Sequence, residues 1–312
     1  TNEKIQIDAN TTVFLKIKKT VQSIDVNLKD NNTSRLVIHG KVPSNINIFI
    51  TSKLQDKKNY IIYDENSLTG CLTFLDANLE NLNLTIENSQ CEDSVNFIRT
   101  IGSINSIKVN NSSSDAIDMD FSNLKVRSVE VNNSLNDCLD LSFGDYFFEK
   151  INLNNCGDKA LSVGEKSKAI VNISEISNSK LAVATKDSSV SYFQKLILNN
   201  VDLCFDNYRK KQEFDGGITF LKNSIYEKCK DKMRFDTKSK IETYWFFKMR
   251  NEIKIKANII DHLNALKEKK LSKPFPDRKI NSIYFDTDDL DYFKDGEEGT
   301  TPRIKVRYRW YD

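Results

Sequence analysis

A 22-residue repeat of small residues is the feature that most constrains how this chain can fold. Its members are Ser94, Ala116, Cys138, Ala160, Ala182 and Cys204. Apolar residues follow these positions in phase. Asparagines recur at the same interval, with one serine among them: Asn111, Asn133, Asn155, Ser177 and Asn199. Positions that repeat in phase indicate stacked, equivalent structural units.

Each unit carries short β-type alternations instead of the two apolar stripes that a helical repeat needs. The runs 117–121 and 139–143 alternate apolar and polar residues, and clusters of Asn, Ser, Gly and Asp separate them. The predicted fold class is therefore mostly β, a parallel β-helix with one coil per repeat. We interpret the asparagine row as a ladder that lines a turn, because side-chain amides can hydrogen-bond from coil to coil.

The character of the sequence changes along the chain and predicts four parts. Residues 1–70 are predicted as a cap or irregular early coils, and 71–225 as the regular β-helix. The charged, aperiodic stretch 226–243 is predicted as a linker, and 244–312 as a small α+β segment.

The composition excludes few classes of function. The 46 basic and 44 acidic residues leave a net charge of +2, which names no partner, and two histidines are too few for zinc clusters or histidine-based triads. The six cysteines form no CxxC pair, so we predict that all of them are reduced and structural. No apolar run reaches the roughly 18 residues of a membrane span. The chain starts at Thr1 with no signal-like stretch, so the sequence assigns no compartment.

One pair of carboxylates stands out within the repeat. Asp118 and Asp140 occupy the same place in successive coils, so their carboxylates are expected to lie about 5 Å apart. Such a pair suits the acid and the nucleophile of a glycosidase. The next two coils place Ser162 and Ala184 there and end the acidic row. We interpret the row as a solvated face with local hydrogen bonds and keep the glycosidase as the alternative.

The end of the chain alternates cations with apolar residues. The cations are Arg303, Lys305, Arg307 and Arg309, and the residues between them are Ile304, Val306, Tyr308 and Trp310. Four cations on one strand face repel one another unless an anion lies opposite them. A protected edge strand is the simpler alternative, but arginine favours forked contacts with phosphate. This pattern predicts a strand that binds a polyanion.

A second charged strand and a helix are predicted upstream. Arg250, Glu252, Lys254 and Lys256 share one face of a strand by period-two alternation. Residues 258–266 then show helical spacing, with Asn258 as the N-cap and His262 on the packed side.

Two parts of the chain resemble known families. Residues 70–225, notably 136–140 and 156–166, resemble the right-handed parallel β-helix repeat proteins of bacteria. Residues 244–312 resemble the start of a VTC domain, the polyphosphate polymerase branch of the triphosphate tunnel metalloenzymes. The runs that carry this second resemblance are 250–254, 281–290 and 303–311, together with Tyr292 and Gly299.

The VTC resemblance implies a closed antiparallel barrel whose basic interior transfers the γ-phosphoryl group of ATP to polyphosphate. It implies a divalent metal, manganese or magnesium, held by an acidic residue, for which Glu252 is the candidate. The implied phosphate-binding residues are Arg250, Lys254, Arg303, Lys305, Arg307 and Arg309. Lys254, Arg307 and Arg309 among them would be catalytic, whereas Tyr284, Phe285 and Asp286 would brace the barrel wall.

Two functions follow for the chain as a whole. A tunnel barrel needs about eight strands, and about three are predicted within 244–312, so we expect a polyphosphate-binding or polyphosphate-synthesising domain that is inactive as a polymerase in this chain. The alternative is a β-helix that interacts with carbohydrate or acts as a surface scaffold without enzymatic activity. Neither interpretation predicts a nucleic-acid partner.

Overall fold

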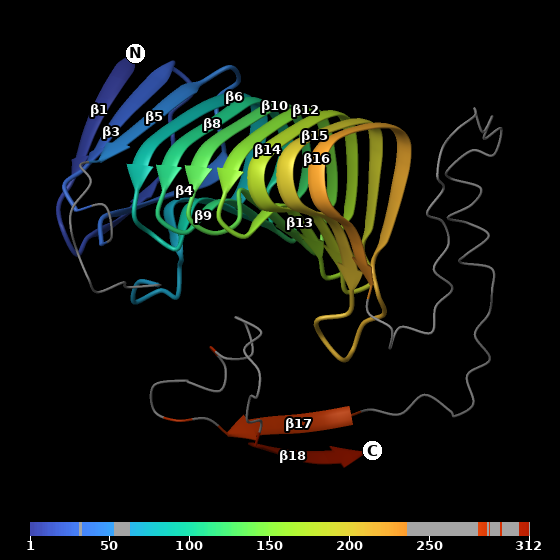
Figure 1. The fold of residues 1–312 in the computed structure, drawn as a ribbon. Coiled ribbons are helices and arrows are strands. Elements are labelled where there is room, and N and C mark those ends of the chain that lie inside the picture. Colours follow the sequence, from blue (N-terminus) through green and yellow to red (C-terminus); the bar gives the residue numbers. More distant parts are fainter. Residues whose placement is uncertain are drawn as a thin grey trace. The chain divides into compact units, whose positions relative to one another are not determined.

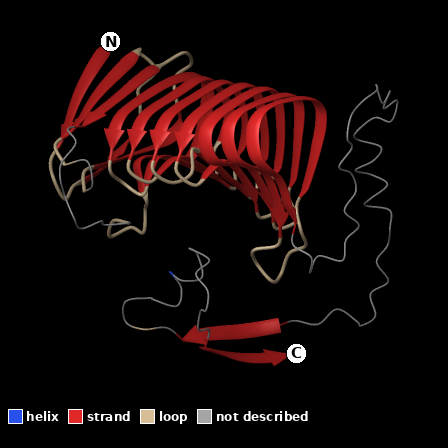
Figure 2. Cartoon of the chain, in the orientation of Figure 1, coloured by secondary structure: helices blue, strands red, loops and turns tan. Residues whose placement is uncertain are grey.

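The computed structural model describes residues 1–30, 33–52, 63–235, 280–285, 287, 294 and 306–311. The chain divides into two compact units, Thr1–Tyr244 and Trp245–Asp312. The first is a parallel β-solenoid of about nine turns, which confirms the predicted fold. Its coils stack one behind the next in chain order (Figure 1), and strands make up most of its described part (Figure 2). Within the described residues, no helix is long and apolar enough to cross a membrane.

Two faces of parallel strands form the solenoid. The first face contains β1 (Asn2–Ile7), β3 (Ser23–Leu28), β5 (Asn47–Ser52), β8 (Ile101–Ser112), β10 (Asn123–Ser134) and β12 (Asp145–Cys156). The second contains β2 (Thr12–Leu15), β4 (Arg35–Lys41), β7 (Asp93–Ile98), β9 (Asp115–Asp120), β11 (Leu139–Ser142) and β13 (Lys159–Gly164). Four long strands bend and contribute to both faces: β6 (Gly70–Ser89), β14 (Lys168–Lys186), β15 (Val190–Tyr208) and β16 (Ile218–Phe235).

The core lies between the two faces and follows the period-two alternation of the strands. Residues such as Ile117, Met119 and Leu141 point inward and are completely buried. Phe74 and Phe97, one coil apart, stack with ring centroids 5.0 Å from each other. The repeated small residues from Ser94 to Cys204 are all buried as well. They begin the second face at a corner where only a small side chain fits inside the coil.

The asparagine ladder is present, with a corrected register. Asn111, Asn133 and Asn155 adopt positive φ values of 60°, 64° and 59°, a conformation that asparagine tolerates. The Nδ2 of Asn133 donates to the Oδ1 of Asn111 at 3.0 Å, and that of Asn155 donates to Asn133 at 2.9 Å. The next positive-φ members are Asn178 and Asn200, where the sequence pattern indicated Ser177 and Asn199. The cause is a 23-residue step in the pairing of β12 with β14.

The prediction that all six cysteines are reduced is wrong. They form three disulfides, Cys71–Cys91, Cys138–Cys156 and Cys204–Cys229, with Cα atoms 5.4, 5.6 and 6.0 Å apart. In the second disulfide, Cys156 ends strand β12 of the first face. Its partner Cys138 begins the second face in the preceding coil. Ser94 and Ser112 occupy the same two positions and are joined by a hydrogen bond of 2.8 Å.

Strand pairing defines the solenoid at both ends of this unit. Residues 1–52 already form paired parallel coils, β1 with β3 and β3 with β5. At the other end, β16 runs to Phe235 and pairs with β15 along its length, so the first ten residues of the predicted linker 226–243 are strand. The 28-residue step from Val190 to Ile218 leaves a loop at 209–217.

The second unit contains one described pair of strands. β17 (Ile280–Phe285) and β18 (Val306–Tyr311) are antiparallel, with Ser282 opposite Arg309 and Tyr284 opposite Arg307. The predicted strands at 244–256 and the predicted helix at 258–266 lie outside the described residues.

Candidate functional site

Six aspartates gather on the outer side of the second face, and we call this group the acidic patch. Its members are Asp93, Asp115, Asp118, Asp120, Asp137 and Asp140. The parallel register pairs Asp93 with Asp115 and Asp118 with Asp140, so equivalent residues lie about 4.8 Å apart along the stack. Because inward residues alternate with these positions in β7, β9 and β11, the carboxylates of three successive coils share one surface.

Two lysines border the patch in the following coils. Lys159, half-buried, places its Nζ 3.2 Å from Asp137 Oδ1. Lys186 is buried, and its Nζ lies 3.8 Å from Asp140 Oδ2. A Cβ built on Gly164 would lie 2.6 Å from Lys186 Cε, so the absence of a side chain at Gly164 makes room for the lysine stem. The two lysines therefore place positive charge beside Asp137 and Asp140, on one side of the patch.

The remaining carboxylates are held in conditions that disfavour ionisation. Burial, followed by the repulsion of nearby carboxylates, raises the pKa of Asp93 to about 8. Burial and the charge of Asp137 raise the pKa of Asp115, and burial and the charge of Asp120 raise that of Asp118. Burial also raises the pKa of Asp120 to about 6. Like charges at such separations cannot all ionise in isolation, so this side of the patch holds protons or needs a cation.

Asp140 is the exception. Burial works against its ionisation, but the ammonium groups of Lys186 and Lys159 outweigh burial and hold its pKa below the ordinary value. Asp118 and Asp140 are thus neighbours in one row, and opposite electrostatic surroundings shift their pKa values apart. Such a pair can hold one proton and one charge side by side, as acid–base chemistry requires.

Two groups of oxygen atoms lie close together in the patch, and among the described residues only the first meets the spacing of metal ligands. Asp115, Asp137 and Asp140 each place a carboxylate oxygen within 4.8 Å of the other two. In this set Lys159 and Lys186 already supply positive charge at Asp137 and Asp140. The other set surrounds Asn96, whose Nδ2 lies 3.2 Å from Asp118 Oδ2 and 3.4 Å from Asp120 Oδ2.

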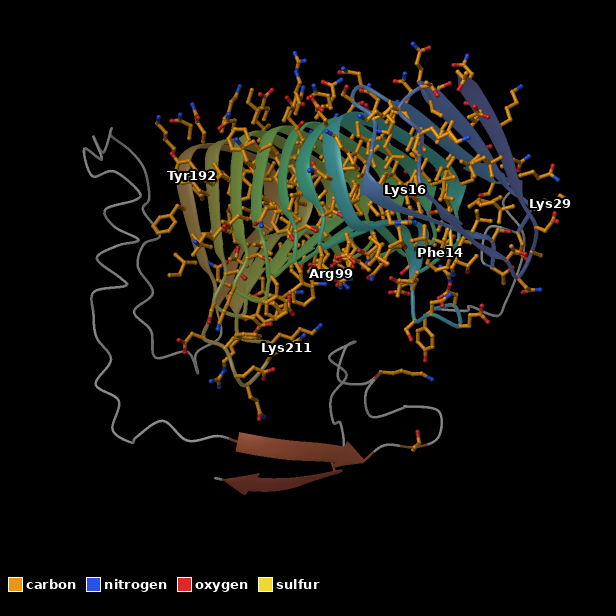
Figure 3. All side chains as sticks on the ribbon, turned by 180° about the vertical axis from the view of Figure 1, so that it is seen from behind. Phe14, Lys16, Lys29, Arg99, Tyr192 and Lys211 are labelled. Carbon is orange, nitrogen blue, oxygen red and sulfur yellow. A yellow bond between two sulfur atoms is a disulfide. The ribbon has the colours of Figure 1, made fainter. Side chains whose placement is uncertain are left out.

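Exposed aromatic rings lie next to the patch, at the turns that follow β9 and β11. Phe121 and Phe143 stack with centroids 4.7 Å apart and planes within 4°, and they are 54% and 39% exposed. Phe214 from the loop at 209–217 meets Phe143 edge-on at 6.0 Å. Lys211 of the same loop pairs with Glu165 at 3.2 Å. Arg99, which precedes Phe121 in the row, and Lys211 mark this edge of the solenoid in Figure 3.

The structure enlarges the site that the sequence indicated. Asp118 and Asp140 are neighbours, as predicted, and both lie half-buried on the outer face among other carboxylates. The sequence analysis missed the parallel row Asp93, Asp115 and Asp137, and also Lys159 and Lys186. Asp93, Asp115, Asp137 and Lys159 follow one another at the same 22-residue interval, whereas Lys186 lies outside this series. That periodicity was the available signal.

The predicted phosphate site lies mostly outside the described residues. Arg307 and Arg309 are placed at alternate positions of β18, opposite Tyr284 and Ser282 of β17. Arg250, Glu252, Lys254, Arg303 and Lys305 fall outside the described part of the chain.

Comparison with known proteins identifies one part of the chain. Residues 239–312 match the family model of the VTC domain. No curated protein and no solved structure gives a significant match. The matched residues include both β17 and β18 and lie beyond the last coil of the solenoid. The chain therefore joins a parallel β-solenoid to a segment that matches the VTC domain model.

Proposed function

We propose that residues 239–312 bind polyphosphate or the triphosphate of ATP and that the β-solenoid carries this segment. The VTC match is the observation that supports the proposal. Within the matched residues, Arg307 and Arg309 lie two positions apart on β18, which pairs antiparallel with β17 as a tunnel barrel requires. Alternate arginines on one strand suit the repeated anionic groups of a phosphate chain.

The proposed chemistry is positioning and charge neutralisation. Arg250, Lys254, Arg303 and Lys305 would extend the contacts of Arg307 and Arg309 along the phosphate chain. Glu252 is the proposed ligand for Mn²⁺ or Mg²⁺, which adds positive charge next to the phosphates. Transfer of the γ-phosphoryl group from ATP would depend on the same contacts, because phosphoryl transfer is catalysed mainly by alignment and electrostatic stabilisation.

The double substitution Arg307→Ala with Arg309→Ala is expected to weaken polyphosphate binding about 100-fold, since two charge-assisted hydrogen bonds contribute about 1.5 kcal/mol each. Binding of labelled polyphosphate by the full chain at several salt concentrations measures the effect, and affinity should fall as salt rises. Lys125→Ala with Arg127→Ala is the matched control, because it removes two exposed cations at alternate positions of β10. An equal loss of polyphosphate affinity in both double variants would contradict the proposal. Affinity that does not change with salt concentration would contradict it as well.

The solenoid has a second candidate function, recognition of a glycan beside the acidic patch. The exposed stack of Phe121 and Phe143 supports it, because exposed apolar patches mark binding sites and a flat ring pair suits the apolar face of a sugar. On a glycan array, Phe121→Ala with Phe143→Ala should abolish retention of the chain. Phe49→Ala, which removes an exposed ring from β5, should leave retention unchanged. A wild-type chain that retains no glycan rules out this function.

A further inference from the structure

The amide of Asn96 lies at the centre of an unusual group of oxygen atoms. Its Nδ2 is 3.4 Å from Asp93 Oδ2, 3.2 Å from Asp118 Oδ2, 3.4 Å from Asp120 Oδ2 and 3.3 Å from Thr69 Oγ1. An amide NH₂ has two hydrogens, so it cannot satisfy four acceptors together. The oxygens therefore converge on this point more densely than the amide alone explains.

The oxygen atom of the same amide, in contrast, has too few hydrogen-bond partners. Asn96 is 3% exposed, and its Oδ1 is buried without a hydrogen-bond partner among the described residues. A buried acceptor that lacks a partner costs about 1–3 kcal/mol. Rotation of the amide by 180° exchanges Oδ1 and Nδ2 with little change in shape. That rotation brings a fifth oxygen into the group, an arrangement that a bound cation would make favourable.

The negative charges of Asp118 and Asp120 in the group also lack an ion-pair partner among the described residues. The structure describes no ion pair of Asp118 or Asp120 within residues 63–235. Arg35 interacts electrostatically with Asp93, and its Nη1 also donates to the carbonyl oxygens of Thr69 and Gly70. In the later coils, Lys159 pairs with Asp137 and Lys186 pairs with Asp140. The first coils of the patch thus have the carboxylates without the lysines.

We propose that these first coils hold a divalent cation of the calcium type, bound by Asp93, Asp118 and Asp120 with Asn96 as a further ligand. Every available donor is a carboxylate, amide or hydroxyl oxygen, the donor set that Ca²⁺ prefers. Calcium–oxygen distances of about 2.3–2.6 Å are shorter than the present distances to Nδ2, so binding draws the three carboxylates inward. The ion takes the role that Lys159 and Lys186 have in the later coils.

The site joins three successive coils. Thr69 precedes β6, Asp93 and Asn96 belong to β7, and Asp118 and Asp120 belong to β9. A bound ion cancels the repulsion between these strands and fixes their spacing. The proposal is independent of the polyphosphate function, which rests on residues 239–312.

The test measures CaCl₂ binding to the full chain by calorimetry and the thermal midpoint in EDTA and in CaCl₂. Calcium should raise the midpoint of the wild type, because it binds the folded state alone. Asp118→Asn should weaken calcium affinity at least about tenfold and lose most of the calcium-dependent rise in midpoint. In EDTA the same variant should melt at or above the wild-type temperature, because it removes a repelling charge.

Two further variants keep the test decisive. Asp120→Asn should repeat the loss if Asp118→Asn does not fold, and circular dichroism in EDTA establishes folding. Asp145→Asn, an exposed aspartate on β12, should bind calcium as the wild type does. No heat and no midpoint shift with millimolar CaCl₂ would overturn the proposal. Equal calcium affinity in the wild type and both patch variants would overturn it as well, because the ion would then bind elsewhere, including at the C-terminal segment.

Discussion

Replacing Lys186 by methionine is expected to destabilise the solenoid by about 3–5 kcal/mol, the cost of leaving a buried charge without its partner. Lys186 is 4% exposed, and its ammonium is the main positive influence on Asp140. Methionine retains most of the stem volume beside Gly164, so packing changes little and the measured loss reports the charge. Urea denaturation of the full chain followed by circular dichroism gives the free energy of unfolding.

The pH dependence identifies the carboxylate responsible. The pKa of Asp140 in the folded state lies below its ordinary value, so its contribution to stability is present above a pH of about 4 and is lost as pH falls through the folded pKa. The variant lacks this contribution. The stability difference between wild type and Lys186→Met should therefore be largest near pH 7 and should narrow below about pH 4.

Two matched variants separate charge from packing. Lys186→Met combined with Asp140→Asn should recover most of the loss, because no uncompensated charge remains. Lys168→Met breaks a pair with the same 3.8 Å separation, to Asp145, but both of its partners are at least half exposed. That exposed pair should contribute less than about 1 kcal/mol. A loss that is equal at pH 4 and pH 7, or that the double variant does not recover, would contradict a role for the charge pair.

Periodicity explains how much of this fold the sequence could predict. A residue that recurs every 22 positions must occupy one place in successive coils, so the buried row from Ser94 to Cys204 and the neighbours Asp118 and Asp140 followed directly. The ladder of Asn111, Asn133 and Asn155 followed for the same reason. One extra residue between β12 and β14 shifts the repeat by one position while the strands stay paired. Asn178 therefore takes the place in the ladder that the 22-residue interval predicted for Ser177.

Contacts between different rows were not predictable in this way. Lys186 reaches Asp140 across two coils and from a neighbouring column of the face. Asn96 contacts Asp118, its partner in the same row, but it also meets Asp93 and Asp120 from neighbouring columns. Such contacts depend on side-chain length and on the offset between columns, neither of which a repeat interval encodes. The acidic patch is accordingly visible in the sequence as separate rows and in the structure as one site.

The disulfides show the same limit and provide the second large prediction. Cys138 and Cys156 are 18 residues apart, an interval unrelated to the 22-residue repeat. They meet because the row that ends the first face and the row that begins the second face are neighbours at one corner, one coil apart. Ser94 and Ser112, also 18 residues apart, meet at that corner. Had the two rows been compared with each other, the pairing of Cys138 with Cys156 would have been a testable expectation.

Removing one bridge by Cys138→Ala with Cys156→Ala should lower the free energy of unfolding by about 3 kcal/mol, because the bridge closes a loop of nearly one coil. The cross-links at Cys71–Cys91 and Cys204–Cys229 close loops of similar length, so full reduction should cost about three times as much by the same reasoning. Denaturation of wild type and variant, with and without dithiothreitol, measures both effects.

The reductant also provides the control. If the bridges act independently, dithiothreitol should destabilise the variant by about two thirds of its effect on the wild type, since two of the three bridges remain. A variant that lacks all six cysteines should not respond to the reductant. Six thiols that react in the unfolded, unreduced wild type would instead show that the cysteines are free. The corner rows would then hold their spacing through packing and serine hydrogen bonds alone, and the loss of 3 kcal/mol should shrink to the cost of two buried sulfhydryl groups, about 1–2 kcal/mol in all.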